Sequence, residues 1–209
     1  MIEILGPSHS NFVRSVALVC AQKSQAFQIG WSLKGEEITF GSDRHASLHP
    51  FSKVPVIYDG EVTLTETLAI CRYLDHKFPE NPLQPEDIKA QAEHDAWCSM
   101  AITQIDQALI RHYMIEFVVP TGVDGAANIE RMMQNKPMAE KAIATLEGQL
   151  KGKDYICGDC FTLADALIAP LVHYACGLKG GLALVKDDSV LRHYVGRILQ
   201  QPKAQEILA

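Results

Sequence analysis

Apolar positions in the first eighty residues change their period several times, which predicts alternating strands and helices. Residues 2–5 read as a short strand that ends at the Gly6-Pro7 turn signal, and residues 10–24 repeat apolar side chains at helical spacing. Residues 26–33 alternate Phe, Ile, Trp and Leu with other positions, as a half-buried strand does. A polar stretch that is irregular or forms a short helix follows.

The sequence KVPVIYDGEVTLTET, residues 53–67, predicts a β-hairpin and the start of a helix. Asp59-Gly60 is a strong two-residue hairpin signal, and it lies between two runs that favour strands. Residues 65–78 then place apolar side chains at helical spacing behind Thr65, a residue type that caps helices. The resulting order, β-α-β-(irregular or short helix)-β-β-α, is that of a thioredoxin-like domain.

The remainder of the chain predicts helices only, so the expected fold class is α/β plus all-α. A polar stretch with three prolines places a linker at residues 79–86, between a thioredoxin-like domain of residues 1–78 and an all-helical domain of residues 87–209. Pro137 is expected to kink or divide a long helical segment. Residues 161–178 are nearly all apolar, which predicts the central helix of a bundle.

Composition and charge exclude several classes of protein. Hydrophobic residues make up 47% and charged residues 21%, as in ordinary globular proteins. The formal net charge is −6 and no run of Lys and Arg occurs, which disfavours nucleic acid and anionic membrane surfaces as partners. No apolar run reaches the ~20 residues of a spanning helix, and the first residues do not read as a signal peptide. We therefore expect a cytoplasmic protein.

The six cysteines predict neither disulfides nor a metal site. They are scattered through apolar patterns, where small buried residues are expected. Cys157 and Cys160 form one Cys-x-x-Cys sequence, but the second Cys pair or His pair of a zinc site is missing. The motif also does not follow a first strand, as a thioredoxin-type redox motif would, so we expect adventitious spacing and no metal.

Proline at position 55 is the unusual residue of the hairpin, because a proline cannot donate a ladder hydrogen bond. Opening a strand is one explanation. A cis Val54-Pro55 bond would instead turn the N–H and C=O of Val54 outward, where they can pair with a short extended peptide. Glu66 and Thr67 open the next helix. They either bind a carboxylate at the positive N-terminal end of this helix or belong to a simple helix cap.

Two segments resemble cytosolic glutathione transferases. Residues 49–79, HPFSKVPVIYDGEVTLTETLAICRYLDHKFP, are similar to the glutathione-binding segment of that family, and residues 154–172 are similar to the start of its buried helix. The linker and the helical second half also fall where the family has them, so the resemblance covers essentially the whole chain and is to Ser-type, theta- or delta-like members. It implies five glutathione-binding residues: Lys53, Val54, Pro55, Glu66 and Thr67.

A catalytic hydroxyl or thiol follows the first strand in this family, where it stabilises the glutathione thiolate. No Tyr occurs in the first 57 residues and no Cys before Cys20, which disfavours the Tyr and Cys types. Ser10 lies four residues before Arg14, the spacing of the Ser-type classes, so the resemblance implies Ser10 as the catalytic residue. Ser8 and Asn11 are the neighbours that could take this role, and an N-cap is the structural alternative for Ser10.

Three histidines are further candidates near this predicted site. His9 could act as a base beside the thiol, although an exposed loop histidine is more often only polar cover. His45 or His49 could reach the glycine carboxylate of glutathione, as Lys53 could, and Lys53 is preferred among them.

Apolar side chains of the long helical segment could line a pocket for the electrophile. The candidates are Ile102, Ile105, Leu109 and Tyr113. A stripe at helical spacing is more often core, however. Thr162 and Asp165 have the spacing of a capping box, which makes Asp165 a structural residue rather than a catalytic acid.

The function expected from the resemblance is conjugation of glutathione, the co-substrate, to small hydrophobic electrophiles by a homodimeric enzyme. A glutathione-dependent isomerase or reductase is weakened by the absence of a Ser-Ser-Cys sequence near residue 10 and of an N-terminal nucleophilic Cys. A non-enzymatic regulatory or assembly module with the same fold is the other alternative, and the retained Glu66-Thr67 pair argues against it.

Overall fold

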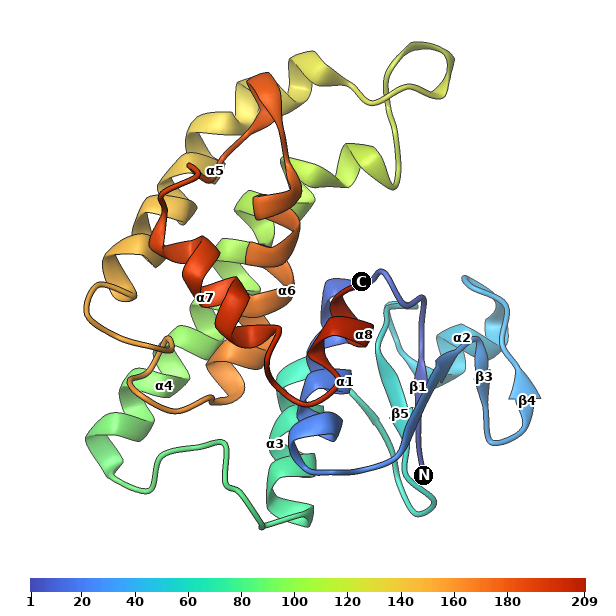
Figure 1. The fold of residues 1–209 in the computed structure, drawn as a ribbon. Helices are drawn as coiled ribbons and strands as arrows, with labels where there is room; N and C mark the ends of the chain where they lie inside the picture. The colour runs from blue at the N-terminus through green and yellow to red at the C-terminus, as the bar shows by residue number, and fades with distance from the viewer. The chain divides into compact units, whose positions relative to one another are not determined.

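The computed structural model describes residues 1–209, which form two compact units (Figure 1). Unit 1 comprises Met1–Pro85 and Ile198–Ala209, and unit 2 comprises Glu86–Arg197. The division falls inside the predicted linker. Residues 198–209 were expected in the helical domain, but they group with unit 1 because helix α8 packs against α1.

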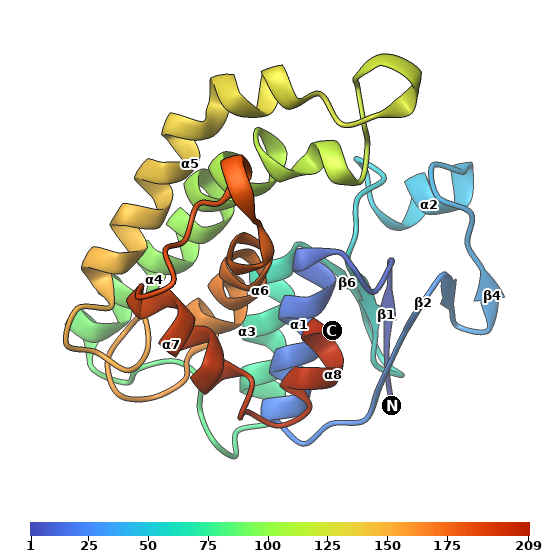
Figure 2. The ribbon, with the colours of Figure 1, turned by 45° about the horizontal axis from the view of Figure 1, so that its top comes forward.

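Unit 1 contains a four-stranded mixed sheet with strand order β2-β1-β5-β6 and a separate β3-β4 pair. Strand β1 runs parallel to β2 and antiparallel to β5, and β5 runs antiparallel to β6. Helices α1 and α3 lie side by side on one face of the sheet, and α2 lies beyond the other (Figures 1 and 2). The elements are β1 (Ile2–Leu5), α1 (Asn11–Gln22), β2 (Phe27–Gly30), β3 (Ser32–Leu33), β4 (Glu36–Glu37), α2 (Asp43–Leu48), β5 (Val56–Tyr58), β6 (Thr63–Thr65), α3 (Thr67–Lys77) and α8 (Ala204–Leu208).

This order confirms the thioredoxin-like prediction, with one correction. The single strand expected over residues 26–33 is divided, because β2 ends at Gly30 and β3 pairs with β4 instead of extending the main sheet. The register also explains the apolar alternation. Leu5 pairs with Val56, and both belong to the buried cluster with Leu33 and Ile38, while their neighbours in the strands point to the opposite face.

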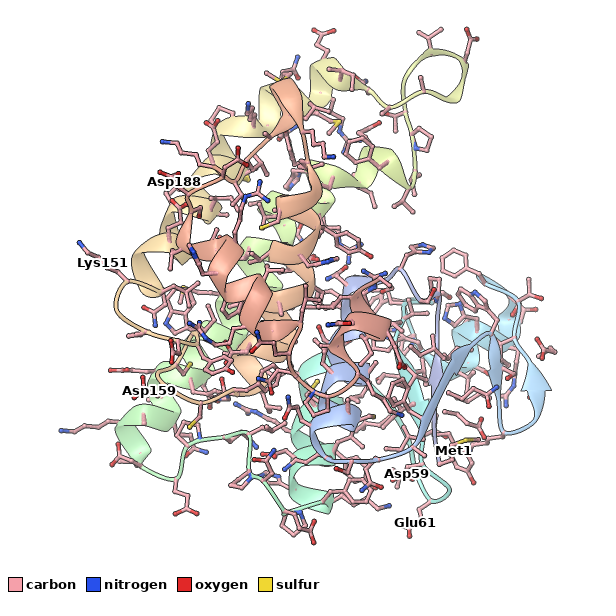
Figure 3. All side chains as sticks on the ribbon, in the orientation of Figure 1. Met1, Asp59, Glu61, Lys151, Asp159 and Asp188 are labelled. Carbon is pink, nitrogen blue, oxygen red and sulfur yellow. The ribbon has the colours of Figure 1, made fainter.

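The turn of the β5–β6 hairpin is fixed to α3 through Asp59. Its carboxylate accepts hydrogen bonds from the N–H groups of Glu61 and Val62 at 2.9 Å, from the Tyr73 hydroxyl, and from Lys77 Nζ at 2.7 Å. Burial raises the pKa of Asp59, but the bonds from Lys77 and Tyr73 outweigh it and hold this pKa well below its usual range. Figure 3 labels Asp59 and Glu61 at this tip.

A buried ion pair joins α1 to α3 and to the segment that leaves α3. Lys23 Nζ lies 2.5 Å from Asp75 Oδ1, and the two side chains are 0% and 4% exposed. The same ammonium donates to the carbonyl oxygens of Glu80 and Asn81, at 3.1 and 2.8 Å. Asp75 also accepts from the N–H of Leu83 at 2.9 Å, so both charged groups are fully hydrogen-bonded.

Unit 2 is entirely helical, as predicted. Its most buried element is α6, whose first ten residues, 163–172, are all buried. Part of the long segment before α5 winds as π-helix rather than α-helix, which no sequence pattern indicated. The elements are α4 (Ile88–Met100), η1 (Ala101–Ile105), η2 (Gln107–Arg111), η3 (Met114–Phe117), η4 (Val123–Gly125), α5 (Ile129–Gln149), α6 (Leu163–Gly177), η5 (Gly180–Leu182) and α7 (Val190–Ile198).

Pro137 does not divide its helix, since α5 continues through it from Ile129 to Gln149. The proline removes the hydrogen bond to the carbonyl of Met133. Both residues are exposed, so water can satisfy that carbonyl and the helix tolerates the loss.

No helix of the chain is both long and apolar enough to cross a membrane.

Asp165 anchors the start of α6 from a fully buried position. Its two oxygens accept from the N–H of Ile156 and the N–H and hydroxyl of Thr162, each at 2.9 Å, and from the Tyr194 hydroxyl at 3.1 Å. Burial raises the pKa of Asp165 to about 6, although these hydrogen bonds oppose the shift. The predicted capping box is confirmed, and Asp165 is a structural residue.

Another buried carboxylate of unit 2, that of Glu116, organises the loop before α5. It accepts from the N–H and hydroxyl of Thr121 at 2.8 Å, from the N–H of Asn128 at 3.0 Å and from Arg131 Nη1 at 2.6 Å. These bonds, from Asn128 and Thr121 above all, lower the pKa of Glu116 to about 2.

Other charged side chains lie on the outside of unit 2, among them Lys151, Asp159 and Asp188 (Figure 3).

Candidate functional site

The bond between Val54 and Pro55 is cis, which was the second of the two explanations for this proline. Strand β5 begins only at Val56, so Val54 lies outside the sheet ladder. Its main-chain N–H and C=O have no hydrogen-bond partner within the chain. An extended peptide can therefore pair with these two groups.

The hairpin register brings Glu66 and Thr67 to the same place. Val56 pairs with Thr65 across the β5–β6 ladder, so two further steps in the same register set Pro55 beside Glu66 and Val54 beside Thr67. Two predicted parts of the glutathione site, separated by ten residues of hairpin, are thus neighbours.

The N-terminus of α3 carries no side-chain cap. Thr65 belongs to strand β6, and the N-cap is Glu66, whose side chain makes no capping bond; the expected cap by Thr65 is therefore wrong. Glu66 has φ 67° and ψ 113°, a backbone conformation that costs a non-glycine residue about 1–3 kcal/mol. Uncapped N–H groups at a positive helix end favour an anion.

Gly6 brings the loop after β1 against Val54. A Cβ built on Gly6 would lie 3.0 Å from the Cβ of Val54 and 2.7 Å from Val13 in α1, and Gly6 has φ +140°. Only glycine accepts this conformation and this close approach. The end of β1, the first turn of α1 and Val54 therefore meet at one point.

Ser10 lies at the N-terminus of α1 and is half-buried. Its Oγ accepts from the N–H of Val13 at the long distance of 3.5 Å, so the N-cap alternative holds as a weak contact. The hydroxyl proton donates to no group of the chain. A hydroxyl can accept and donate at once, so capping leaves the proton of Ser10 available to a sulfur anion.

Arg14 holds the loop that precedes Ser10. Its Nε donates to the Ser8 carbonyl at 2.8 Å, and its Nη1 and Nη2 donate to the main-chain oxygens of Leu208 and Ala209, at 3.1 and 2.6 Å. Arg14 as a whole is 5% exposed. Arg14 thereby connects the candidate site to α8, a contact that no local sequence pattern could reveal.

The remaining neighbours divide into exposed and buried groups. Ser8, His9 and Lys53 are exposed, while Asn11 is 5% exposed. His49 is also buried, and its Nδ1 accepts from the N–H of Phe51 at 3.1 Å. The ring of His49 is therefore neutral, and its Nε2 lies 3.6 Å from Glu66 Oε1, too far for a hydrogen bond.

The predicted electrophile-pocket residues lie mainly in the core of unit 2. Ile105, Leu109 and Tyr113 are 3%, 0% and 0% exposed, and the Tyr113 hydroxyl donates to the Leu182 carbonyl. Only Ile102 retains a half-buried side chain. The structure thus places three of the four candidates as core residues.

The cysteines and metal-ligand residues form no second site. No disulfide joins any of the six cysteines, and burial raises the pKa of Cys157 to about 11, which disfavours its thiolate form. No three His, Cys, Asp or Glu side chains are grouped so that they could hold a metal ion.

Comparisons with known proteins agree with this fold. The family model for the glutathione S-transferase N-terminal domain matches residues 7–82, and that for the C-terminal domain matches residues 126–197. Glutathione S-transferase from Hyoscyamus muticus is 26% identical over 180 residues, which are 85% of this chain and 84% of the relative. Glutathione S-transferase theta-1 from Rattus norvegicus is 31% identical over 144 residues, 67% of this chain and 58% of the relative.

Solved structures share the fold at lower sequence identity. Poplar glutathione transferase F1 has a TM-score of 0.82 at 21% identity, with 99% of this chain and 96% of that chain covered. A theta class glutathione S-transferase from Xanthomonas axonopodis pv. citri, solved with glutathione bound, has a TM-score of 0.80 at 19% identity and the same coverage. The fold defines the class of protein: a thioredoxin-like unit followed by a helical unit. The chain belongs to the glutathione S-transferase family.

Proposed function

We propose that this protein is a glutathione transferase that joins the sulfur of glutathione to small hydrophobic electrophiles, with Ser10 as the catalytic residue. One observation carries the proposal, namely that three features lie close together. The hairpin register brings the unpaired main-chain groups of Val54 to the uncapped start of α3. The close approach of Gly6 to Val54 brings the loop that leads to Ser10 to the same place. The family membership and the glutathione bound in a structural relative support the choice of ligand.

Each part of glutathione has a chemically suitable partner in unit 1. The N–H and C=O of Val54 pair with the cysteinyl residue as a short added strand. The glutamyl carboxylate binds at the uncapped N-terminus of α3, beside Glu66 and Thr67. Lys53, which is exposed, offers a cation to the glycine carboxylate.

Ser10 then raises the fraction of thiolate. A thiol with a pKa near ~8.5 is only a few per cent ionised at pH 7. Lowering that pKa by one to two units requires ~1.4–2.8 kcal/mol of preferential stabilisation, which a hydroxyl hydrogen bond to sulfur supplies with help from the positive end of α1. The thiolate forms a carbon–sulfur bond with its lone pair, the leaving group departs with the bonding pair, and the thiol proton passes to solvent.

The experiment is to replace Ser10 by Ala and to measure conjugation of an aryl halide together with glutathione affinity. We expect the rate to fall roughly tenfold or more, because one pKa unit corresponds to a factor of ten, while the affinity changes little. Ser8→Ala is the matched control, since its hydroxyl lies on the same loop but is exposed. An unchanged rate in Ser10→Ala would transfer the role to Ser8, Asn11 or a backbone N–H.

Two other functions use the same binding site. A glutathione-dependent isomerase or reductase would bind glutathione but show no net conjugation, and a regulatory or assembly module would lack turnover altogether. Retention on immobilised glutathione and a rise in melting temperature with glutathione test the binding step for all of them. A protein that is not retained, and whose melting temperature stays constant at saturating glutathione, would contradict the proposal.

Homodimerisation and a cytoplasmic location are further expectations from the family. Phe51 is 76% exposed in the loop before Val54, an unusual exposure for a large aromatic residue, and it gives the dimer hypothesis a specific position to test. Sedimentation of the protein and of Phe51→Ser would show whether a dimer forms and whether Phe51 contributes to it.

A further inference from the structure

His45 is a completely buried histidine whose two ring nitrogens both have main-chain partners. Its Nδ1 accepts from the N–H of Gly41 at 3.1 Å. A nitrogen that accepts carries no proton, so the ring is neutral and its proton lies on Nε2. Nε2 lies 3.2 Å from the carbonyl oxygen of Lys53 and donates to it. His45 therefore does not reach a glycine carboxylate directly, which was one of the alternatives from the sequence.

Two aromatic rings hold this imidazole in its orientation. The centroid of Trp31 lies 5.9 Å from that of His45 in an edge-to-face arrangement, and that of Phe40 lies 5.4 Å away. Trp31 and Phe40 also contact each other edge to face at 5.6 Å. The ring is thus fixed by packing as well as by its two hydrogen bonds.

The Lys53 carbonyl matters because it shares a peptide unit with the Val54 N–H. In a trans peptide these two groups are coplanar and point in opposite directions. A donor that holds the carbonyl of Lys53 on one side therefore directs the N–H of Val54 to the other. The segment needs such support, since Ser52 just before it adopts φ 46°.

We propose that His45 is a positioning residue of the glutathione site, which orients the Lys53–Val54 peptide so that the Val54 N–H is presented to the cysteinyl residue of glutathione. This inference rests on the proposed function. Helix α2 holds the imidazole ring of His45, and the Nε2 of this ring fixes the orientation of the Lys53–Val54 peptide.

The test compares His45→Asn with His45→Gln. The amide oxygen of Asn occupies the position of Nδ1 and accepts from Gly41, but Asn does not reach Lys53. The amide nitrogen of Gln occupies the position of Nε2 and donates to the Lys53 carbonyl. We expect His45→Asn to raise the KM for glutathione roughly five- to tenfold, the range for one lost hydrogen bond, while the KM for the electrophile stays constant. His45→Gln should remain within about twofold of the wild type for both substrates.

Melting temperatures of both variants separate positioning from general stability. A merely structural role predicts that the two variants lose stability alike and that neither KM changes selectively, and that result would overturn the proposal. If His45→Asn does not fold, Phe40→Ala takes its place, because Phe40 is 65% exposed and its loss removes one of the two rings that pack against the imidazole without removing the imidazole. An unchanged KM for glutathione in Phe40→Ala would then overturn it. A wild-type protein that does not bind glutathione would refute the proposed function together with this inference, whereas an active wild type with a normal His45→Asn variant refutes only the inference.

Discussion

Replacement of Lys23 by Met should destabilise unit 1 strongly, because it removes the only cation that faces the buried Asp75 carboxylate. The Lys23 ammonium lies 2.5 Å from Asp75 and also satisfies two main-chain carbonyls, with its side chain fully buried. Leaving a buried charge without its partner costs about 3–5 kcal/mol. For a chain of this size each kcal/mol lowers the melting temperature by about 2–4 °C, so we expect a decrease of about 6–20 °C.

The measurement is thermal and urea unfolding followed by circular dichroism. Lys89→Met is the matched control, since Lys89 is exposed and should change the free energy of unfolding by less than about 0.5 kcal/mol. The double variant Lys23→Met with Asp75→Leu should recover part of the loss, because no unpaired charge stays buried, although main-chain groups of Glu80, Asn81 and Leu83 lose their partners. A loss below about 1 kcal/mol in Lys23→Met alone would refute the reasoning.

The loss of stability caused by Lys23→Met should depend on pH. Burial raises the pKa of Asp75, but hydrogen bonds from Lys23 and Gln84 outweigh it and lower the pKa below the ordinary value. A carboxyl whose folded pKa is lowered stabilises the fold above its unfolded pKa, near ~3.9, and loses this contribution as the pH falls below it. The difference in stability between wild type and Lys23→Met should therefore narrow below about pH 4.

Three further predictions concern other residues. Gly6→Ala should lower both stability, by about 2 kcal/mol or more, and glutathione affinity, since its Cβ would meet Val54 at positive φ; unchanged values of both would contradict the described contact. Asp165→Asn should cost at least about 2 kcal/mol in urea unfolding, because the amide cannot accept from all four donors; a smaller loss would mean that the buried network rearranges. Glu116 has a pKa of about 2, so its contribution to the stability of the fold is complete above about pH 4.5 and is lost as the pH falls towards 2. Glu116→Gln should therefore flatten the curve of stability against pH over this range. A curve identical to that of the wild type would count against this role.

Local patterns predicted the thioredoxin-like order and the hairpin, because each depends on residues close together in the sequence, whereas the cis proline was one of two explanations that the sequence left open. Asp59-Gly60 specifies its turn by side-chain bonds to the next two N–H groups, and Thr162 with Asp165 specifies the start of α6 in the same local manner. The family resemblance implies Val54, Glu66 and Thr67 as glutathione-binding residues and Ser10 as the catalytic residue, and these four roles remain predictions.

Other features depend on tertiary contacts that sequence periodicity does not contain. Helical spacing could not separate pocket from core at Leu109 and Tyr113, since both kinds of position are apolar. The cap by Thr65 failed because strand pairing with Val56 takes that residue into the sheet. The role of His45 depends on a carbonyl eight residues away, and a lone histidine in a polar stretch carries no sign of it.

The docking of α8 against α1 has a consequence for synthesis on the ribosome. Residues 86–197 are translated between the two segments that compose unit 1, which takes roughly 6–22 s at ordinary elongation rates. During that interval Arg14 has none of its partners at Leu208 and Ala209. The half of the protein that is made first is therefore completed last, and nascent chains stalled within residues 86–197 should carry a sheet domain that proteases still cut.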